Sequence, residues 1–271
     1  MSTPAYAAFF GFKSLPFSKE IDDKDLWLPP SKIALVDDML EALSARQSIA
    51  LSGDPGVGKT CVLRALRHRL PDQGFRLTYC HNATLGRRDF YRQLCLALGL
   101  SPSATAAAVF YAVSTHVQEL SRDRLHPVFL LDEAHLLHQD TLDHLHILLN
   151  YEWDQRALLS LVLVGLPELS ERLELRRNRS LHSRVHFRFA IGPTTPEDTA
   201  EYCRYRLANA GFERDLFTQD ALTMLHEASS GALRAIDRIA SLALRDAARR
   251  KKKLVERDCI ARVIDQDAHT E

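Results

Sequence analysis

Five short, largely apolar runs, separated by longer segments with helical spacing, constrain the fold of this chain more than any other feature. The runs are Ser48–Leu51, Arg76–Cys80, Val128–Leu131, Leu161–Val164 and Val185–Ile191. Strands that are apolar along most of their length are typical of parallel sheets, because helices cover both sheet faces. The alternation therefore predicts a doubly wound α/β domain with a five-stranded parallel sheet.

The segments between these runs have lengths and apolar spacings suited to helices. They are Lys59–Leu70, Arg88–Leu98, Thr105–Leu120, Thr141–Leu149 and Glu168–Leu175. The alternation stops at Gly192–Pro196, where Thr195 can cap a helix and Pro196 suits its first position. The helices expected beyond this break are Glu197–Asn209, Thr218–Ala228, Ala232–Arg249 and Glu256–Asp265. We therefore expect an α/β domain with its N-terminal segment over residues 1–191, and a small all-α domain over residues 192–271.

Composition bounds the cellular setting and the partners. Lys+Arg and Asp+Glu both count 35, so the formal net charge is zero and any basic surface for nucleic acid must be local. The five cysteines include no C-x-x-C pair and are expected to be reduced thiols. The longest apolar stretch, Ala157–Leu166, is about half of the roughly 20 residues that a membrane-spanning helix needs. Met1–Phe10 has no signal-peptide pattern, so we expect a cytoplasmic protein with no membrane partner.

The strongest local signal is the octapeptide Gly53-Asp54-Pro55-Gly56-Val57-Gly58-Lys59-Thr60, which matches the pattern G-x-x-x-x-G-K-[ST] in full. Its glycines let successive backbone N–H groups turn inward around phosphates. Lys59 can reach the β- and γ-phosphate oxygens of ATP, and Thr60 offers a hydroxyl to Mg²⁺. A chance match has a probability on the order of one in a hundred, and here the motif also follows a strand and opens a helix. We expect ATP along Gly53–Cys61, with Cys61 packing at the start of that helix.

A carboxylate pair, Asp132-Glu133, directly follows the apolar run Val128–Leu131. A carboxylate at the carboxyl end of a buried strand can orient Mg²⁺, and the next carboxylate can polarise the attacking water. Such a pair alone also fits an ordinary strand-end turn. Together with the phosphate loop it favours a site for ATP hydrolysis, with Thr60 and Asp132 as metal ligands and Glu133 as the catalytic base.

At this point the chain resembles the AAA+ ATPases, and its motifs follow the order that they have in that family. After Asp132-Glu133 comes an apolar strand that ends in Val164–Leu169. Many relatives carry a polar sensor of the γ-phosphate at this strand tip, where this chain has Leu166. The resemblance implies a P-loop ATPase domain followed by a helical lid, and it leaves open whether a first polar sensor exists.

The same resemblance implies roles for arginines. Arg184, in Ser-Arg-Val before the fifth strand, best fits the finger that stabilises the γ-phosphate charge of a neighbouring subunit, and Arg179 is the alternative. A solvated surface arginine remains the rival interpretation of either. Arg234, in Gly231–Arg234, resembles the second sensor, with which the lid contacts the nucleotide. The resemblance thus implies a homo-oligomer, as a ring or a helical filament.

Within AAA+, the chain is most similar to the small ATPases of the ExeA, TniB and TnsC group, many of which transposons encode. The segments that suggest this are Phe9–Phe17, Asp132–Leu137 and Gly165–Leu169. The aromatic residues of the first segment also fit a hydrophobic clasp that packs the N-terminal segment onto the core. In transposition ATPases, the region after the second strand faces duplex DNA.

Arg87, Arg88 and Arg92 lie in that region of this chain, on one expected helix start, and form a compact basic spot that suits phosphates. A solvated helix face is the alternative. The run Arg249–Lys253 is a second, weaker candidate, because positive charge is favourable at the end of a helix in any case. Four nearby histidines (His135, His138, His144 and His146) have no spacing typical of a metal site and are read as surface or supporting residues.

Three functions follow as hypotheses. The first is a regulator of DNA transposition that assembles on duplex DNA with ATP, recruits a transposase and works with a target-selector protein. The second is a secretion-associated ATPase of the ExeA kind, which we expect to need a membrane segment and a further C-terminal domain that this sequence lacks. The third is a nucleotide-dependent signalling switch, against which Glu133 argues, because a pure switch needs no catalytic base.

Overall fold

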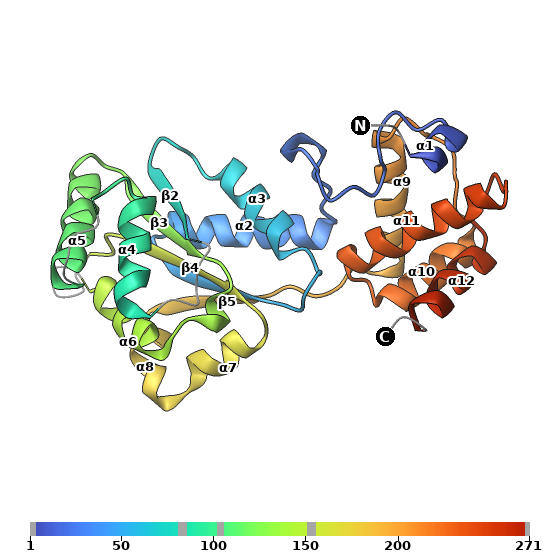
Figure 1. Cartoon of the computed structure of the whole chain (residues 1–271). Helices are drawn as coiled ribbons and strands as arrows, with labels where there is room; N and C mark the ends of the chain where they lie inside the picture. The colour runs from blue at the N-terminus through green and yellow to red at the C-terminus, as the bar shows by residue number, and fades with distance from the viewer. Residues whose placement is uncertain (1–3, 81–85, 102–105, 151–155, 269–271) are drawn as a thin grey trace. The chain divides into compact units, whose positions relative to one another are not determined.

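The structure is a computed structural model and describes residues 4–80, 86–101, 106–150 and 156–268 (Figure 1). Its contacts divide the chain into two compact units, each described here by itself. The sheet unit comprises Ser31–Asp54 and Val62–Ile191. The helical unit comprises Met1–Pro30, Pro55–Cys61 and Gly192–Glu271.

The sheet unit is built on five parallel strands in the order β2-β3-β4-β1-β5. The strands are β1 Ser48–Ser52, β2 Phe75–Cys80, β3 His126–Leu131, β4 Ser160–Gly165 and β5 Val185–Ala190. All residues of β1, β3 and β4 are buried, and their interiors are apolar, with polar residues only at the strand ends. The five-stranded parallel sheet expected from the sequence is confirmed.

Helices cover both faces of this sheet. On one face, Ala50, Phe129, Leu131, Leu161 and Leu163 share a core with five helices. These are α4 Arg87–Ala97, α5 Ala106–Arg122, α6 Gln139–Leu148, α7 Glu168–Glu174 and α8 Arg179–His182. Helices α2 Pro30–Ser44 and α3 Lys59–Arg69 lie on the opposite face (Figure 1). The sequence patterns did not predict α2.

The helical unit contains α1 Ala5–Phe10, α9 Pro196–Asn209, α10 Gln219–Ser229, α11 Leu233–Arg249 and α12 Arg257–Ala268. Thr195 caps α9 as expected. Its hydroxyl accepts from the Asp198 N–H, and the Asp198 carboxylate accepts from the Thr195 N–H, each over 3.1 Å. Residues that recur at three- and four-residue steps along α11 are buried, so one face of this helix forms the core of the unit.

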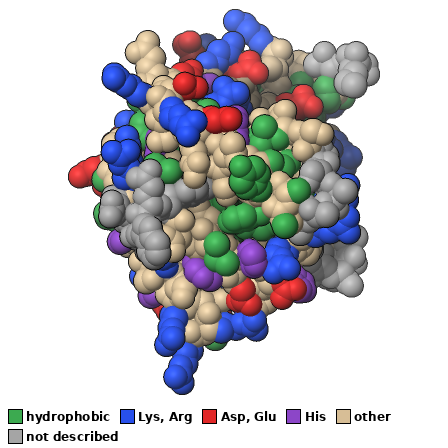
Figure 2. Space-filling model, turned by 90° about the vertical axis from the view of Figure 1, so that its left-hand side faces the viewer, with side chains coloured by type: hydrophobic (Ala, Val, Ile, Leu, Met, Phe, Trp, Pro, Cys, Tyr) green, Lys and Arg blue, Asp and Glu red, His purple; other side chains and the backbone are tan. Residues whose placement is uncertain are grey.

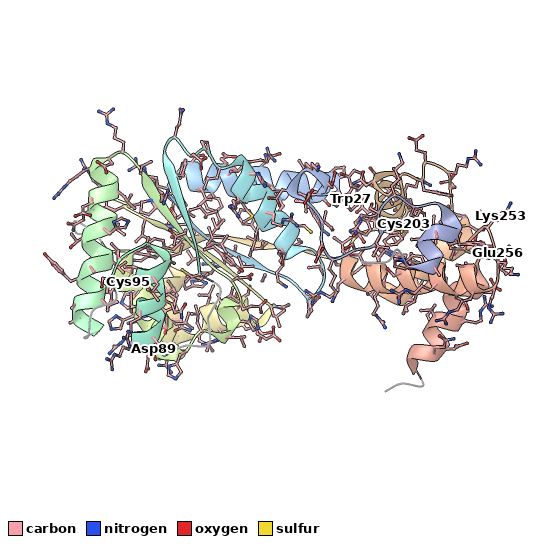
Figure 3. The ribbon with its side chains drawn as sticks, turned by 45° about the horizontal axis from the view of Figure 1, so that its top comes forward. Trp27, Asp89, Cys95, Cys203, Lys253 and Glu256 are labelled. Carbon is pink, nitrogen blue, oxygen red and sulfur yellow. The ribbon has the colours of Figure 1, made fainter. Side chains whose placement is uncertain are left out.

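The N-terminal segment packs into the core of the helical unit. Phe12, Phe17 and Trp27 are buried there, and the Trp27 ring lies 5.3 Å from the Tyr202 ring, centre to centre. Trp27 and Cys203, labelled in Figure 3, belong to this same core. The sequence-based division assigned this segment to the α/β domain, whereas the structure groups Met1–Pro30 with the C-terminal helices.

A buried arginine holds this segment in place. Arg206 donates through Nε to the Pro16 carbonyl over 2.6 Å and through Nη2 to the Ser18 carbonyl over 2.7 Å. Its Nη1 lies 3.6 Å from the Asp237 carboxylate. Backbone carbonyls that would otherwise lose their hydrogen bonds on burial are thereby satisfied by a charged donor.

Two further features of the described residues bear on the cellular setting. None of the five cysteines, all of which lie in the described part of the chain, forms a disulfide. No helix in the described ranges combines the length and the apolar character that crossing a bilayer requires.

Candidate nucleotide site

The glycine-rich loop connects the end of β1, at Ser52, to the start of α3, at Lys59. Gly53 donates its N–H to the Gly165 carbonyl of β4 over 3.2 Å, which fixes where the loop leaves the sheet. Gly56 and Gly58 have φ of 82° and 104°, values that side-chain-bearing residues rarely adopt. Such positive φ values are what lets consecutive N–H groups line a concave anion site.

Arg234, near the start of α11, meets this loop within the helical unit. Its N–H donates to the Gly56 carbonyl over 3.3 Å. A Cβ added to Gly56 would lie 3.1 Å from the Arg234 Cβ and 3.7 Å from the Ala232 Cβ. Gly56 is therefore required both for its backbone conformation and for the close approach of α11. Two residues that were predicted separately, from the phosphate loop and from the second sensor, are brought together.

Asp132 follows β3 at the same sheet edge from which the loop leaves β1, because parallel strands place their carboxyl ends at one edge. Three contacts hold it. Its N–H donates to the Cys80 carbonyl over 3.2 Å, its Oδ1 accepts from the Glu133 N–H over 2.9 Å, and its Oδ2 accepts from the Tyr79 hydroxyl over 3.0 Å. Burial, and after it the Asp132 charge, raises the pKa of Tyr79 to about 12, so Tyr79 keeps its proton and stays a donor. The sequence patterns did not single out Tyr79.

Glu133 has a left-handed backbone, with φ of 54° and ψ of 34°. Residues other than glycine rarely adopt this conformation, and it is often found at functional sites. Its side chain is 51% exposed, so the carboxylate is open to solvent. The bend directs the chain from β3 into the short helix Ala134–Leu136.

His135, in that short helix, contacts the tip of β4. Its Nδ1 accepts from the Leu166 N–H over 3.3 Å and lies 3.6 Å from Oε2 of Glu133. The imidazole is 10% exposed. The side chain of Leu166 offers no polar group at the strand tip, and the structure places the ring of His135 there instead.

Arg184 lies at the opposite edge of the sheet, directly before β5, and donates to the Ser180 carbonyl over 3.2 Å. With Arg46, Arg156 and His186 it lines a cavity of about 410 Å³. Six-residue strands such as β3 span roughly 20 Å. Arg184 and Asp132 of one sheet unit therefore lie at opposite edges of it. Arg179, the alternative finger, begins α8 just upstream.

Arg87, Arg88 and Arg92 lie on the first turns of α4, as expected. Arg87 contacts the Nε2 of His144 over 2.8 Å, and Arg92 lies 3.9 Å from Asp89, the acidic residue labelled near the start of α4 in Figure 3. Arg87 and Arg88 lie on the first turn, where cations oppose the helix dipole and Asp89 offsets part of that effect. The preceding residues 81–85, which were part of the same predicted basic region, lie outside the described residues.

The surface around these helices is mixed in character. Figure 2 shows hydrophobic side chains gathered on the face of the molecule on which α5 lies, with histidines and cations around them. Leu96 of α4 and Tyr111 of α5 are 56% and 73% exposed. The basic surface that Arg87, Arg88 and Arg92 form is therefore confined to a small area, in keeping with the zero net charge of the chain.

The second basic candidate, Arg249–Lys253, is partly neutralised. Arg250 donates to Asp246 over 3.2 Å, and Lys252 donates to Glu256 over 2.6 Å and to Asp258 over 2.9 Å. The turn that carries these pairs runs from α11 to α12, where Lys253 and Glu256 are labelled in Figure 3. These pairs reduce the charge available for phosphates.

Known proteins resemble this chain both in sequence and in fold. Residues 41–173 match the family model described as AAA domain. The chain is 32% identical over 257 residues to general secretion pathway protein A of Aeromonas hydrophila, a match that covers 93% of this chain and 47% of the relative. The chain thus spans about half the length of this curated relative.

Solved structures share the fold at lower sequence identity. Drosophila ORC bound to DNA matches with a TM-score of 0.72 and 18% identity, over 97% of this chain and 66% of that chain. The Aeropyrum pernix ORC1 protein in complex with DNA matches with a TM-score of 0.63 and 21% identity, over 88% of this chain and 66% of that chain. At these identities the likeness concerns the fold alone.

Proposed function

We propose that this chain, which has the P-loop AAA+ fold and carries an AAA domain over residues 41–173, binds and hydrolyses ATP. One observation carries the proposal. The phosphate-binding loop leaves β1 at the same sheet edge at which the acidic pair Asp132-Glu133 follows β3. Phosphoryl transfer to water requires three parts. These are a loop that binds the phosphates, a carboxylate that binds the metal ion and a second carboxylate that activates the water.

The roles divide as follows. The loop backbone, with Gly56 and Gly58 at positive φ, cradles the phosphates, and Lys59 neutralises charge on the β- and γ-phosphate oxygens. Glu133 accepts a proton from the attacking water. Arg234, whose backbone N–H donates to the Gly56 carbonyl of the loop, supplies a further cation to the nucleotide.

The available donors fit Mg²⁺. The ion prefers hard oxygen ligands, few of them from the protein, with water and phosphate supplying the others. The exposed hydroxyl of Thr60 and the carboxylate of Asp132 are such donors, and the hydroxyl of Tyr79 orients the carboxylate. Bound there, Mg²⁺ would neutralise charge on the phosphate oxygens. Asp54 to Val57 and Cys61 shape the loop and add no metal ligand in this proposal.

Completion of the site by a second copy of the chain is part of the proposal. Arg184 lies at the amino edge of the sheet, so it can reach a nucleotide only on a neighbouring subunit. Subunits arranged head to tail, as a ring or a filament, would each supply Arg184 to the next site. An arginine in this role stabilises the charge that develops on the γ-phosphate.

The biological setting we favour is regulation of DNA transposition. ATP would assemble subunits on duplex DNA through Arg87, Arg88 and Arg92. The assembly would recruit a transposase with a target-selector protein, and hydrolysis would release it. The clustering of these arginines over the first turns of α4 supports an anionic partner.

A secretion-associated ATPase is the second candidate, and the similarity to general secretion pathway protein A favours it. The two settings differ in their partner and share the ATP chemistry. ATP-dependent binding to duplex DNA would support the first setting. Absence of DNA binding at low salt would favour the second.

The ATPase proposal is tested by separating binding from turnover. Lys59→Ala should abolish nucleotide binding, whereas Glu133→Gln should keep binding and stop hydrolysis. Titration with a fluorescent ATP analogue and measurement of phosphate release distinguish the two effects. Unchanged turnover in Glu133→Gln would contradict the assignment of the base.

A further inference from the structure

His135 lies between the catalytic base and the tip of the adjacent strand. Its Nδ1 is 3.3 Å from the Leu166 N–H and 3.6 Å from Oε2 of Glu133. The ring is held in this place, because it is 10% exposed and faces β4. A polar side chain in such a position can fix the location of a carboxylate that must point at a water molecule.

The tip of β4 is shaped to admit this ring. A Cβ added to Gly165 would lie 3.1 Å from both the N and the Nδ1 of His135, and 3.2 Å from the Leu169 Cβ. Contacts of this length are tight, so even a methyl group at Gly165 would push the histidine. Gly165, at the end of β4, therefore leaves the space that the His135 ring occupies.

The backbone that carries His135 is anchored from a second side. Arg172 of α7 donates through Nη1 to the His135 carbonyl and through Nη2 to the Leu137 carbonyl, the latter over 2.7 Å. Asn178 in turn donates to the Arg172 carbonyl over 2.6 Å. The short helix after Glu133 is thus fixed to α7, and His135 cannot move freely relative to β4.

We propose that His135 is the positioning residue for Glu133, and that it takes the place of the polar side chain that Leu166 does not provide. The inference rests on the proposed ATPase function. The single in-plane site of Nδ1 serves one neighbour at a time. In the tautomer with a bare Nδ1 the ring accepts from the Leu166 N–H, and in the tautomer with a proton on Nδ1 it donates toward Oε2 of Glu133, 3.6 Å away. The second tautomer holds the carboxylate at the strand tip, where it can act on water.

Three substitutions separate positioning from packing. His135→Leu keeps most of the volume and removes the polar atoms. His135→Asn offers a carbonyl oxygen to Leu166 and an amide N–H to Glu133 near the position of Nδ1. His135→Gln places the same amide one bond farther along. We expect kcat at saturating ATP to fall 10- to 100-fold in the Leu variant, with KM for ATP changed less than about threefold, because only the base is misplaced.

Rescue is the decisive readout. We expect His135→Asn to recover kcat to within about threefold of wild type, and His135→Gln to recover less. Gly165→Ala should lower kcat without changing any polar group. His138→Ala serves as the matched control, since the His138 side chain is 57% exposed and faces Asp140. Thermal unfolding of each variant checks that the sheet unit remains folded.

The outcomes are distinguishable. If the wild-type protein hydrolyses ATP and His135→Leu has the same kcat, this inference is overturned and the ATPase proposal stays intact. An equal loss in the Asn and Leu variants, with both folded, would reduce His135 to a packing role. A wild-type protein that hydrolyses no ATP would overturn the proposed function and this inference with it.

Discussion

The hydroxyl of Tyr79, at the end of β2, donates a hydrogen bond over 3.0 Å to Oδ2 of Asp132, the carboxylate that follows β3. Parallel pairing of β2 with β3 brings the two residues to one sheet edge, with Cys80 opposite Leu131. A carboxylate that accepts from this hydroxyl and from the Glu133 N–H keeps one orientation. The pair therefore links the second strand to the proposed metal site.

Tyr79→Phe should raise the Mg²⁺ concentration needed for half-maximal ATPase activity by about 10-fold, because the carboxylate loses the donor that orients it. Activity at saturating Mg²⁺ should change less. The measurement is a Mg²⁺ titration of turnover at fixed ATP. Tyr111→Phe is the matched control, because Tyr111 lies on α5 and is 73% exposed. A Tyr79→Phe titration that superimposes on the wild-type curve would remove Tyr79 from the site.

Mixing two inactive variants should restore part of the activity if Arg184 acts on a neighbouring subunit. In a mixture of Arg184→Ala and Glu133→Gln, some interfaces pair an intact Glu133 with an intact Arg184. Wild-type activity per subunit should also rise with protein concentration. No complementation, with activity per subunit independent of concentration, would mean that one subunit completes its own site. Arg179→Ala, mixed in the same way, tests the alternative finger.

Binding to duplex DNA should require ATP or a non-hydrolysable analogue, and it should be cooperative and largely independent of sequence, because a few phosphate contacts per subunit bind weakly alone. Replacing Arg87 and Arg88 by alanine should weaken binding similarly for unrelated sequences. It should also lower the slope of log affinity against log salt by about 2 per subunit. Anisotropy titrations at several salt concentrations measure both effects.

A second double variant, Arg249→Ala with Lys253→Ala, removes the same charge from the other candidate surface and shows which of the two contacts DNA. Nucleotide binding should be unchanged in both double variants. If wild-type protein binds DNA and the Arg87/Arg88 variant binds equally well, the contact surface is misassigned. If the wild type shows no binding at low salt, the transposition setting loses its support.

Acidification should destabilise the sheet unit through His126. Burial, assisted by the nearby Arg46 charge, lowers the pKa of His126 from 6.5 to about 4. The folded state therefore keeps the ring neutral where the unfolded chain takes up a proton. The stabilisation is complete above pH 6.5 and is lost as the pH falls toward 4. The maximum effect is about 3 kcal/mol.

Chemical denaturation of wild type and His126→Gln between pH 7 and 4 measures this dependence. The glutamine can keep a hydrogen bond to the Ser160 hydroxyl, which lies 2.9 Å from Nε2 in the native protein. Its stability should fall less steeply over this interval, although carboxylates with lowered pKa, such as Asp246, also contribute near pH 4. Parallel curves for the two proteins would contradict the assignment to His126.

The strands and the phosphate loop could be predicted because their signals are local. Each core strand has an apolar interior, and the loop is a contiguous motif. Helix α2 carries a helical period in Val36, Met39 and Leu43, all fully buried, although no motif adjoins it. The signal for α2 is therefore present in the sequence.

The contacts of Tyr79 and His135 could not be predicted, since they depend on which strands are neighbours and in what register. An apolar period of two residues in a strand, or of 3.6 residues in a helix, shows which face of that element is buried. It does not show which other strand or helix packs against that face. The same limit explains the N-terminal segment. Its aromatic residues predicted burial, and only the structure shows that they pack against the C-terminal helices.

The packing of that segment has a consequence for synthesis on the ribosome. Phe12, Phe17 and Trp27 emerge before the helices that bury them, which begin at Pro196, after the sheet unit. At about 5–20 residues per second, the aromatic residues wait on the order of 10 to 40 seconds for their partners. The sheet unit can fold in that interval, whereas the helical unit is completed by contacts of very large sequence separation. Apolar side chains exposed for so long are sites at which a nascent chain aggregates or recruits a chaperone.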